Sequence, residues 1–148
     1  MAAIQMSELL KRCQQFHHRL AEHYEEMEHE VRRANVRAML DFMARHERHL
    51  EQCLALYEKT AAPNVAHAWF RVAPHDEAKR LLHDDVVDPD MGVEDVIDMA
   101  MRFDECLVRM YRRLAESTQN TALKEALENL LALEEREEAR LAWDLQQG

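Results

Sequence analysis

Glycine, proline and serine are scarce in this sequence. Its 148 residues include two glycines and three prolines, and serine occurs only at Ser7 and Ser117. All-β sandwiches and barrels need many turn residues, so this scarcity argues against both. It also excludes the glycine-rich loops that bind phosphate in P-loop and dinucleotide-binding proteins. Neither serine lies in the nucleophile elbow of an α/β-hydrolase.

Clustered positive charge and long apolar runs are also lacking. The formal net charge is -10, whereas proteins that bind nucleic acid need clustered cations, so we expect no nucleic-acid partner. No run approaches the roughly 20 apolar residues that cross a bilayer. Residues 1–13 lack the apolar core of a signal peptide, which predicts a cytoplasmic protein without membrane attachment. Cys13, Cys53 and Cys106 form no CxxC pair, so we expect free thiols rather than a zinc ribbon.

Hydrophobic residues (47%) and charged residues (32%) are both plentiful, which predicts one soluble domain over residues 1–148. Apolar residues recur at helical spacing in four segments, about 7–33, 36–59, 93–116 and 121–146. Short breaks near Asn35 and at 117–120 predict two helical hairpins. Residues 60–92 would be a long crossover that contains a short helix. The predicted fold class is all-α: an antiparallel four-helix bundle with the connectivity of ferritin-like proteins.

The two halves of the chain share a pattern of polar residues. The first and third predicted helices share an aromatic residue followed by a polar one, at Phe16-His17 and Phe103-Asp104. The second and fourth share a polar pair three residues apart: His46 with His49, and Glu135 with Glu138. The two halves therefore place metal-binding side chains at corresponding positions.

These polar residues fall on or beside the apolar stripes of their helices. At about 100° per residue, Glu135 and Glu138 lie within about 40° of Leu131. Burial of an unpaired carboxylate costs several kcal/mol, and a bound cation would remove that cost. Glu47 and Glu134 flank the stripes and would serve as ligands if a helix rotated slightly. The sequence therefore predicts a metal site in the bundle core, with these ligands: His17, His46, His49, Asp104, Glu135 and Glu138.

Three stretches resemble the rubrerythrin-like branch of the ferritin-like superfamily: residues 44–51, 93–116 and 131–141. The resemblance extends over about residues 9–145. It implies two bound metal ions, usually iron, and either peroxide reduction or oxidation of ferrous iron.

The ligand set departs from the one that this resemblance implies. The family has four carboxylates and two imidazoles, whereas this chain would have three of each. His17, His46 and Asp104 replace glutamates, and Glu138 replaces a histidine. Every position keeps a metal-binding group, which predicts a remodelled His/carboxylate site of the dinuclear type.

Iron is the expected metal of this site, as one or two ions, and Zn, Mn and Cu remain open. Glu135 would be the bridging ligand. Tyr24 and Tyr111 lie one or two turns from the ligands and would hydrogen-bond them.

Three functions are compatible with these residues. The first is a non-haem metal-dependent oxidoreductase that reduces peroxide or oxygen, or a ferroxidase; it would need a separate electron donor. The second is metal storage or sensing without turnover. The third is a metal-free helical dimer whose inward polar groups pair with one another. We expect a homodimer, with Trp69, Phe70 and Trp143 as candidate interface residues.

Overall fold

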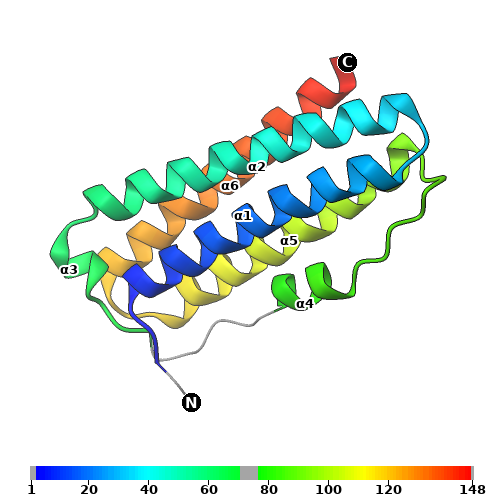
Figure 1. Ribbon diagram of the computed structural model, residues 1–148. Coiled ribbons are helices and arrows are strands. Elements are labelled where there is room, and N and C mark those ends of the chain that lie inside the picture. The colour runs from blue at the N-terminus through cyan, green and yellow to red at the C-terminus, as the bar shows by residue number, and fades with distance from the viewer. Residues whose placement is uncertain (1–2, 71–76, 148) are drawn as a thin grey trace.

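A computed structural model of the chain describes residues 3–70 and 77–147, and these residues form six helices and no strand. Four of the helices are 25 to 27 residues long. They lie side by side in Figure 1, which confirms the predicted all-α bundle. The helices, in chain order, are α1 (Met6–Glu30), α2 (Ala34–Thr60), α3 (Pro63–Ala66), α4 (Glu77–Asp84), α5 (Val93–Ser117) and α6 (Thr121–Gln147). No helix of the described residues is long and apolar enough to cross a membrane.

The long helices form two hairpins, α1 with α2 and α5 with α6 (Figure 1). The bounds predicted from the sequence are close to those observed, except that α1 ends at Glu30 and the turn lies at residues 31–33, before Asn35. The guanidinium of Arg37 donates hydrogen bonds to the carbonyls of Val31 (3.2 Å) and Arg32 (3.0 Å). These bonds satisfy backbone groups at the turn, and a longer α1 would lose them.

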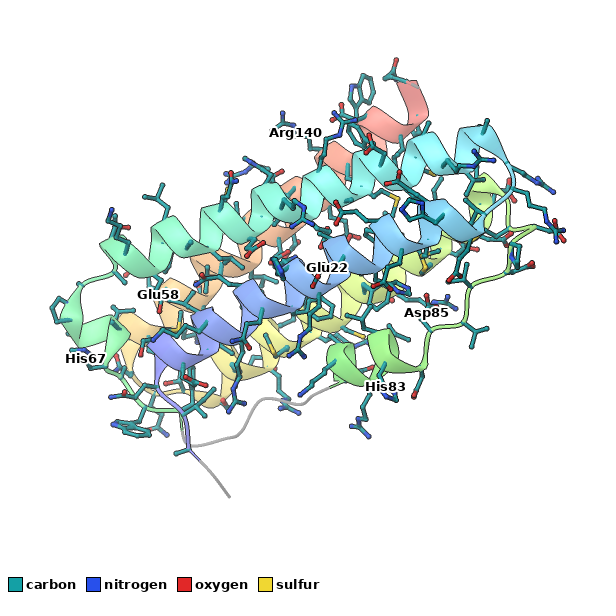
Figure 2. The ribbon with its side chains drawn as sticks, in the orientation of Figure 1. Glu22, Glu58, His67, His83, Asp85 and Arg140 are labelled. Carbon is teal, nitrogen blue, oxygen red and sulfur yellow. The ribbon has the colours of Figure 1, made fainter. Side chains whose placement is uncertain are left out.

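The crossover between the hairpins returns along the outside of α5 to the opposite end of the bundle (Figure 1). It contains α3 and α4, and residues 71–76 of it lie outside the described part of the chain. Two side-chain contacts hold it against the first hairpin. His23 Nε2 lies 2.7 Å from Asp85 Oδ2, and Arg32 Nη1 lies 2.8 Å from Asp90 Oδ1. Figure 2 shows Asp85 on this crossover.

The apolar stripes of the four long helices form one core. Leucine and methionine dominate it, with the rings of Tyr24, Phe103 and Tyr111 at most 2% exposed. Phe70 is also only 2% exposed, so the prediction that it belongs to an interface is wrong. Its amide donates to the carbonyl of Ile4 at 2.9 Å, which packs the crossover against the N-terminus.

Candidate metal centre

Four polar side chains lie inside this apolar core. His17 of α1 is 0% exposed, Glu47 of α2 is 2% exposed, and Glu134 and Glu137 of α6 are 3% and 7% exposed. Each lies on the buried stripe of its helix: Glu47 falls between Met43 and Leu50, and Glu134 follows Leu130 by one turn. Helical periodicity alone therefore carries them inward.

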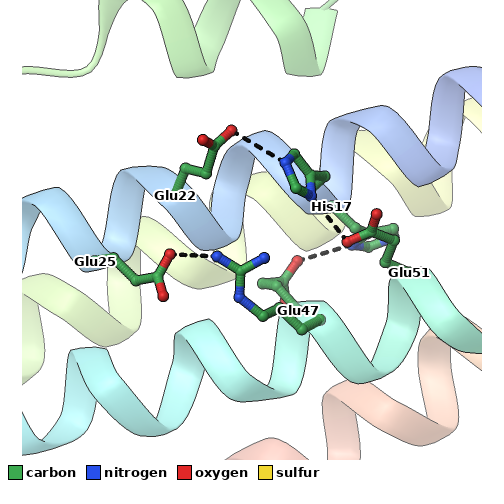
Figure 3. A network of polar contacts seen from close by, with 7 residues as sticks. His17, Glu22, Glu25, Glu47 and Glu51 are labelled. Carbon is green, nitrogen blue, oxygen red and sulfur yellow. Dashed lines mark hydrogen bonds and ion pairs between the residues drawn. The ribbon is translucent and has the colours of Figure 1, made fainter.

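His17 joins the two hairpins. Its Nδ1 lies 2.8 Å from Oε1 of Glu47, and its Nε2 lies 3.0 Å from Oε1 of Glu134. Figure 3 shows His17 and Glu47 beside the surface ion pairs of their two helices. A neutral imidazole carries one N–H, so only the protonated ring donates to both carboxylates. Burial lowers the pKa of His17, but the charges of Glu134 and Glu47 outweigh it and raise the pKa well above its usual value.

Glu137 extends the cluster toward the surface. Its Oε1 lies 3.9 Å from Nε2 of His49, whereas its Oε2 is buried and has no hydrogen-bond partner among residues 3–70 and 77–147. A buried carboxylate oxygen without a partner costs free energy that most folded proteins avoid. This oxygen is therefore available to a further group, such as a cation or a water molecule.

Asp104 of α5 is half-buried and lies within electrostatic range of the same glutamates. Burial raises the pKa of Asp104 well above its usual value, and the negative charges of Glu47, Glu134 and Glu138 raise it further. His17 acts in the opposite direction. All four long helices thus contribute a side chain to one polar cluster, which we call the core cluster: His17, Glu47, Asp104, Glu134 and Glu137.

The two predicted tyrosines lie beside the core cluster. Burial raises the pKa of Tyr24 well above its usual value, and Glu47 and Asp104 add to the shift. Burial also raises the pKa of Tyr111, to which Cys13 and Glu134 contribute. That either tyrosine hydrogen-bonds a metal ligand stays a prediction.

The structure places the two predicted α2 histidines differently. His46 is half-buried, and burial lowers its pKa. The side chain of His49 is 50% exposed, and its Nε2 lies 3.6 Å from Sγ of Cys53. The side chain that α2 buries among the polar residues is Glu47, which the sequence placed only at the flank of the stripe.

The prediction that Glu135 faces the core is wrong. Its side chain is 51% exposed and pairs with Arg112 across 3.7 Å. Glu138 is half-buried; burial raises its pKa, as do the charges of Glu105, Glu135 and Glu134. The prediction places the centre of the α6 apolar stripe at Leu131, which is only half-buried. A shift of one residue along a helix turns the predicted face by about 100°, which is enough to move Glu135 to the surface.

The residues that α6 does bury are Glu134 and Glu137. Glu134 is the alternative ligand predicted from the sequence, whereas Glu137 is not among the predicted ligands. A stripe centred on Leu130, which is 0% exposed, would have found both.

The donor set of the core cluster fits one metal ion better than two. Ferritin-like di-iron sites take a glutamate from each of two helices and Glu-x-x-His from each of the other two. Here the residue three positions after Glu47 is Leu50, which is 1% exposed, so one of the six positions is apolar. Carboxylates with one imidazole suit a single Fe, Mn or Zn ion.

The present side-chain arrangement is not yet that of a metal site. Within the described ranges, no three or more His, Cys, Asp or Glu side chains are positioned to hold an ion. For a metal to bind, His17 would have to give up one of its two carboxylate contacts.

Comparison with known proteins supports the fold. No family model matches the chain, and no curated protein matches it. It is similar to a crystal structure from Thermotoga maritima described as a candidate ferritin-like diiron-carboxylate protein, with a TM-score of 0.57 and 12% sequence identity. The match covers 99% of this chain and 97% of that one. At this identity the likeness shows the fold alone, so the chain has a ferritin-like fold.

Proposed function

We propose that this chain is a metal-binding protein that holds one transition-metal ion among its four long helices. The ligands would come from the core cluster, and this set replaces the one predicted from the sequence. The observation that carries the proposal is the buried Oε2 of Glu137, which has no partner within a cluster of carboxylates. A cation satisfies that oxygen and relieves the repulsion among its neighbours.

Charge balance supports the same proposal. Three buried glutamates outweigh the single imidazolium that His17 supplies. Asp104 adds a fourth carboxyl group, whose pKa is raised first by burial and then by the negative charges of Glu47, Glu134 and Glu138. A divalent ion coordinated by these groups neutralises charge that water cannot reach.

The residues of the core cluster would have distinct roles. Glu134 and Glu137 lie one turn apart on α6 and would bind the ion together, while Glu47 and Asp104 approach it from α2 and α5. His17 would bind through one ring nitrogen and hydrogen-bond a glutamate through the other. Bound Fe or Mn supplies redox chemistry toward oxygen or peroxide, whereas Zn supplies Lewis acidity.

We further infer a rubrerythrin-like redox role, in peroxide or oxygen reduction or in ferroxidase chemistry. The fold and the carboxylate-rich donor set support this role, and such a cycle would use a separate electron donor. Peroxide consumption by the metal-loaded protein in the presence of a chemical reductant tests it. No turnover above that of free metal would favour storage or sensing instead.

We also propose a homodimer in the cytoplasm. Trp69 and Trp143 are 61% and 63% exposed, and large exposed aromatic side chains are enriched at interfaces. Sedimentation velocity of the wild type and of a Trp143→Ser variant tests the dimer. A monomeric wild type would contradict it.

Elemental analysis of untagged protein, grown with balanced Fe, Mn, Zn and Cu, tests the metal site. We expect about one ion per chain in the wild type, because binding would satisfy the buried Oε2 of Glu137 and offset the negative charge of the core cluster. Glu134→Gln and Glu47→Gln should lose the ion. Two controls should keep it: Glu135→Gln, at the exposed neighbour of Glu134, and Glu51→Gln, one turn after Glu47, where the half-buried carboxylate contacts His18 instead of His17. Equal loss in Glu134→Gln and Glu135→Gln, or a wild type that binds no ion on titration, would overturn the proposal.

A metal-free structural role is the second candidate, and one observation favours it. Both ring nitrogens of His17 already contact carboxylates, so its imidazolium serves as an internal cation between the hairpins. In that case Fe²⁺, Mn²⁺ and Zn²⁺ would give no binding heat with the wild type. The helical dimer would then be the functional unit.

A further inference from the structure

A groove of about 550 Å³ lies outside the core cluster, between α1, α4 and α5. Its volume falls within the range of small-molecule sites, about 300–1,000 Å³. The short helix α4 forms one wall and has no fully buried residue.

The floor of the groove is apolar. It is formed by Leu9 and Phe16 of α1 and by Leu107 and Met110 of α5, and Leu82 of α4 faces them. The ring of Phe16 also packs edge-on against His17, with 5.8 Å between ring centroids. None of the five residues of the core cluster lines the groove, so the two sites share no side chain.

The rim of the groove is mostly basic. Arg12 and Arg19 of α1 and Lys79 of α4 line it, with Glu8 as an acidic lining residue. Arg12 lies 3.5 Å from Glu8. In the described part of the chain, Arg19 and Lys79 have neither an ion-pair partner nor a side-chain hydrogen bond. On a chain with a net charge of -10, two unpaired cations at the mouth of an apolar groove favour an anionic ligand.

We propose that this groove binds an amphipathic carboxylate, with its apolar body on the Phe16 floor and its carboxylate at Arg19 and Lys79. A free acid suits this shape because the apolar surface is recessed between helices and partly covered by α4. A bilayer would contact the rim but would not reach the floor. The proposal is independent of whether the core cluster holds a metal.

Calorimetry with dodecanoate, below the concentration at which it forms micelles, tests the groove. The wild type should bind dodecanoate more tightly than dodecanol, which lacks the charge, and more tightly than butyrate, which lacks the chain. Charge reversal in Lys79→Glu or Arg19→Glu should weaken binding by up to about fivefold, the upper end of the range expected for an exposed charge pair. The matched control Arg80→Glu alters the next residue of α4, which does not line the groove, and should bind as the wild type does.

A second variant tests the apolar part of the groove. Ala78 lines the groove from α4, and Ala78→Phe should fill the space and abolish dodecanoate binding while far-UV circular dichroism is unchanged. Equal binding by the wild type, Lys79→Glu and Ala78→Phe would overturn the proposal, as would no binding to the wild type. Binding to anionic phosphatidylglycerol vesicles with none to free dodecanoate would also overturn it, in favour of a membrane surface.

Discussion

His17 is the residue on which the electrostatics of the core depend. Its ring separates Glu47 of one hairpin from Glu134 of the other, at 2.8 and 3.0 Å. Without that ring, two buried carboxylates would face each other with no cation between them. Loss of one partner from a buried charged pair costs far more than loss of an exposed pair.

A His17→Leu substitution should therefore destabilise the chelator-treated protein by about 3–5 kcal/mol. The adjacent His18 is 48% exposed and contacts Glu22 and Glu51 at the surface, so His18→Leu should change stability by less than about 1 kcal/mol. Urea denaturation with excess chelator measures both changes. Equal effects of the two substitutions would show that the His17 contacts do not stabilise the core.

Cys13 should be the least reactive of the thiols. Burial raises the pKa of Cys13 to about 11, against opposing contributions from Tyr111, His17 and Arg12 and a reinforcing one from Glu134. Since the thiolate is the nucleophile, only about one Cys13 in a thousand is reactive at pH 8. Cys53 is half-exposed and should be modified first.

Iodoacetamide labelling at pH 8, followed by peptide mass spectrometry, measures the rate at each cysteine. Because the pKa is raised, the rate at Cys13 should continue to increase up to about pH 11 rather than levelling off near the usual thiol value. Labelling of Cys13 as fast as Cys53 in the native protein, with equal rates in urea, would contradict the assigned burial.

At the scale of the element, the sequence predicts where each long helix begins and ends better than it predicts which face of the helix points into the core. The apolar spacing identified all four long helices, and most bounds fall within a few residues of those observed. In α6, however, Leu130 and Leu131 are adjacent, and each is followed by a polar pair at suitable spacing. The hydrophobic pattern fits either of these two faces equally well. The contact between Glu134 and His17, 117 positions away, shows which face is buried.

The α2 helix raises the same difficulty. His46 and Glu47 are neighbours, and either falls near the apolar stripe. The contact with His17, 30 positions away, identifies Glu47 as the buried residue. No local signal carries that information, because a charged residue is buried only where a partner on another helix compensates it.

Leu50 provides a test of how α2 has departed from the ferritin-like ligand arrangement. It lies three residues after Glu47 and is 1% exposed, so Leu50→His would create Glu-x-x-His facing the core cluster. We expect the metal content to rise from about one to about two ions per chain. In the metal-free state, the buried imidazole should cost about 2–4 kcal/mol of stability.

Leu54→His is the matched control, because Leu54 is 0% exposed on the same stripe but lies one turn beyond the ligand position. It should destabilise the protein similarly without any gain in metal. Elemental analysis and urea denaturation of both variants measure these effects. A similar metal content in the two variants would mean that the position after Glu47 does not face the cluster.

At the scale of the whole molecule, the core cluster depends on docking of the two hairpins. Glu47 belongs to the first hairpin and Glu134 and Glu137 to the second, and neither hairpin alone carries the proposed ligand set. A metal bound there stabilises only the docked bundle, because these ligands do not lie close together in the unfolded chain. Metal affinity is then coupled to global unfolding rather than to local order.

Removal of the metal should therefore lower the melting temperature of the entire bundle in one cooperative step. At a free metal concentration 100 times Kd, binding adds about 2.7 kcal/mol, which for a domain of this size corresponds to a shift of about 5–10 °C. Differential scanning calorimetry with and without chelator measures that shift. Glu135→Gln should retain it and Glu134→Gln should lose it, because only the second removes a buried ligand. A chelator-independent melting temperature in both variants and in the wild type would instead assign the docking energy to the His17 contacts with Glu47 and Glu134, without a metal.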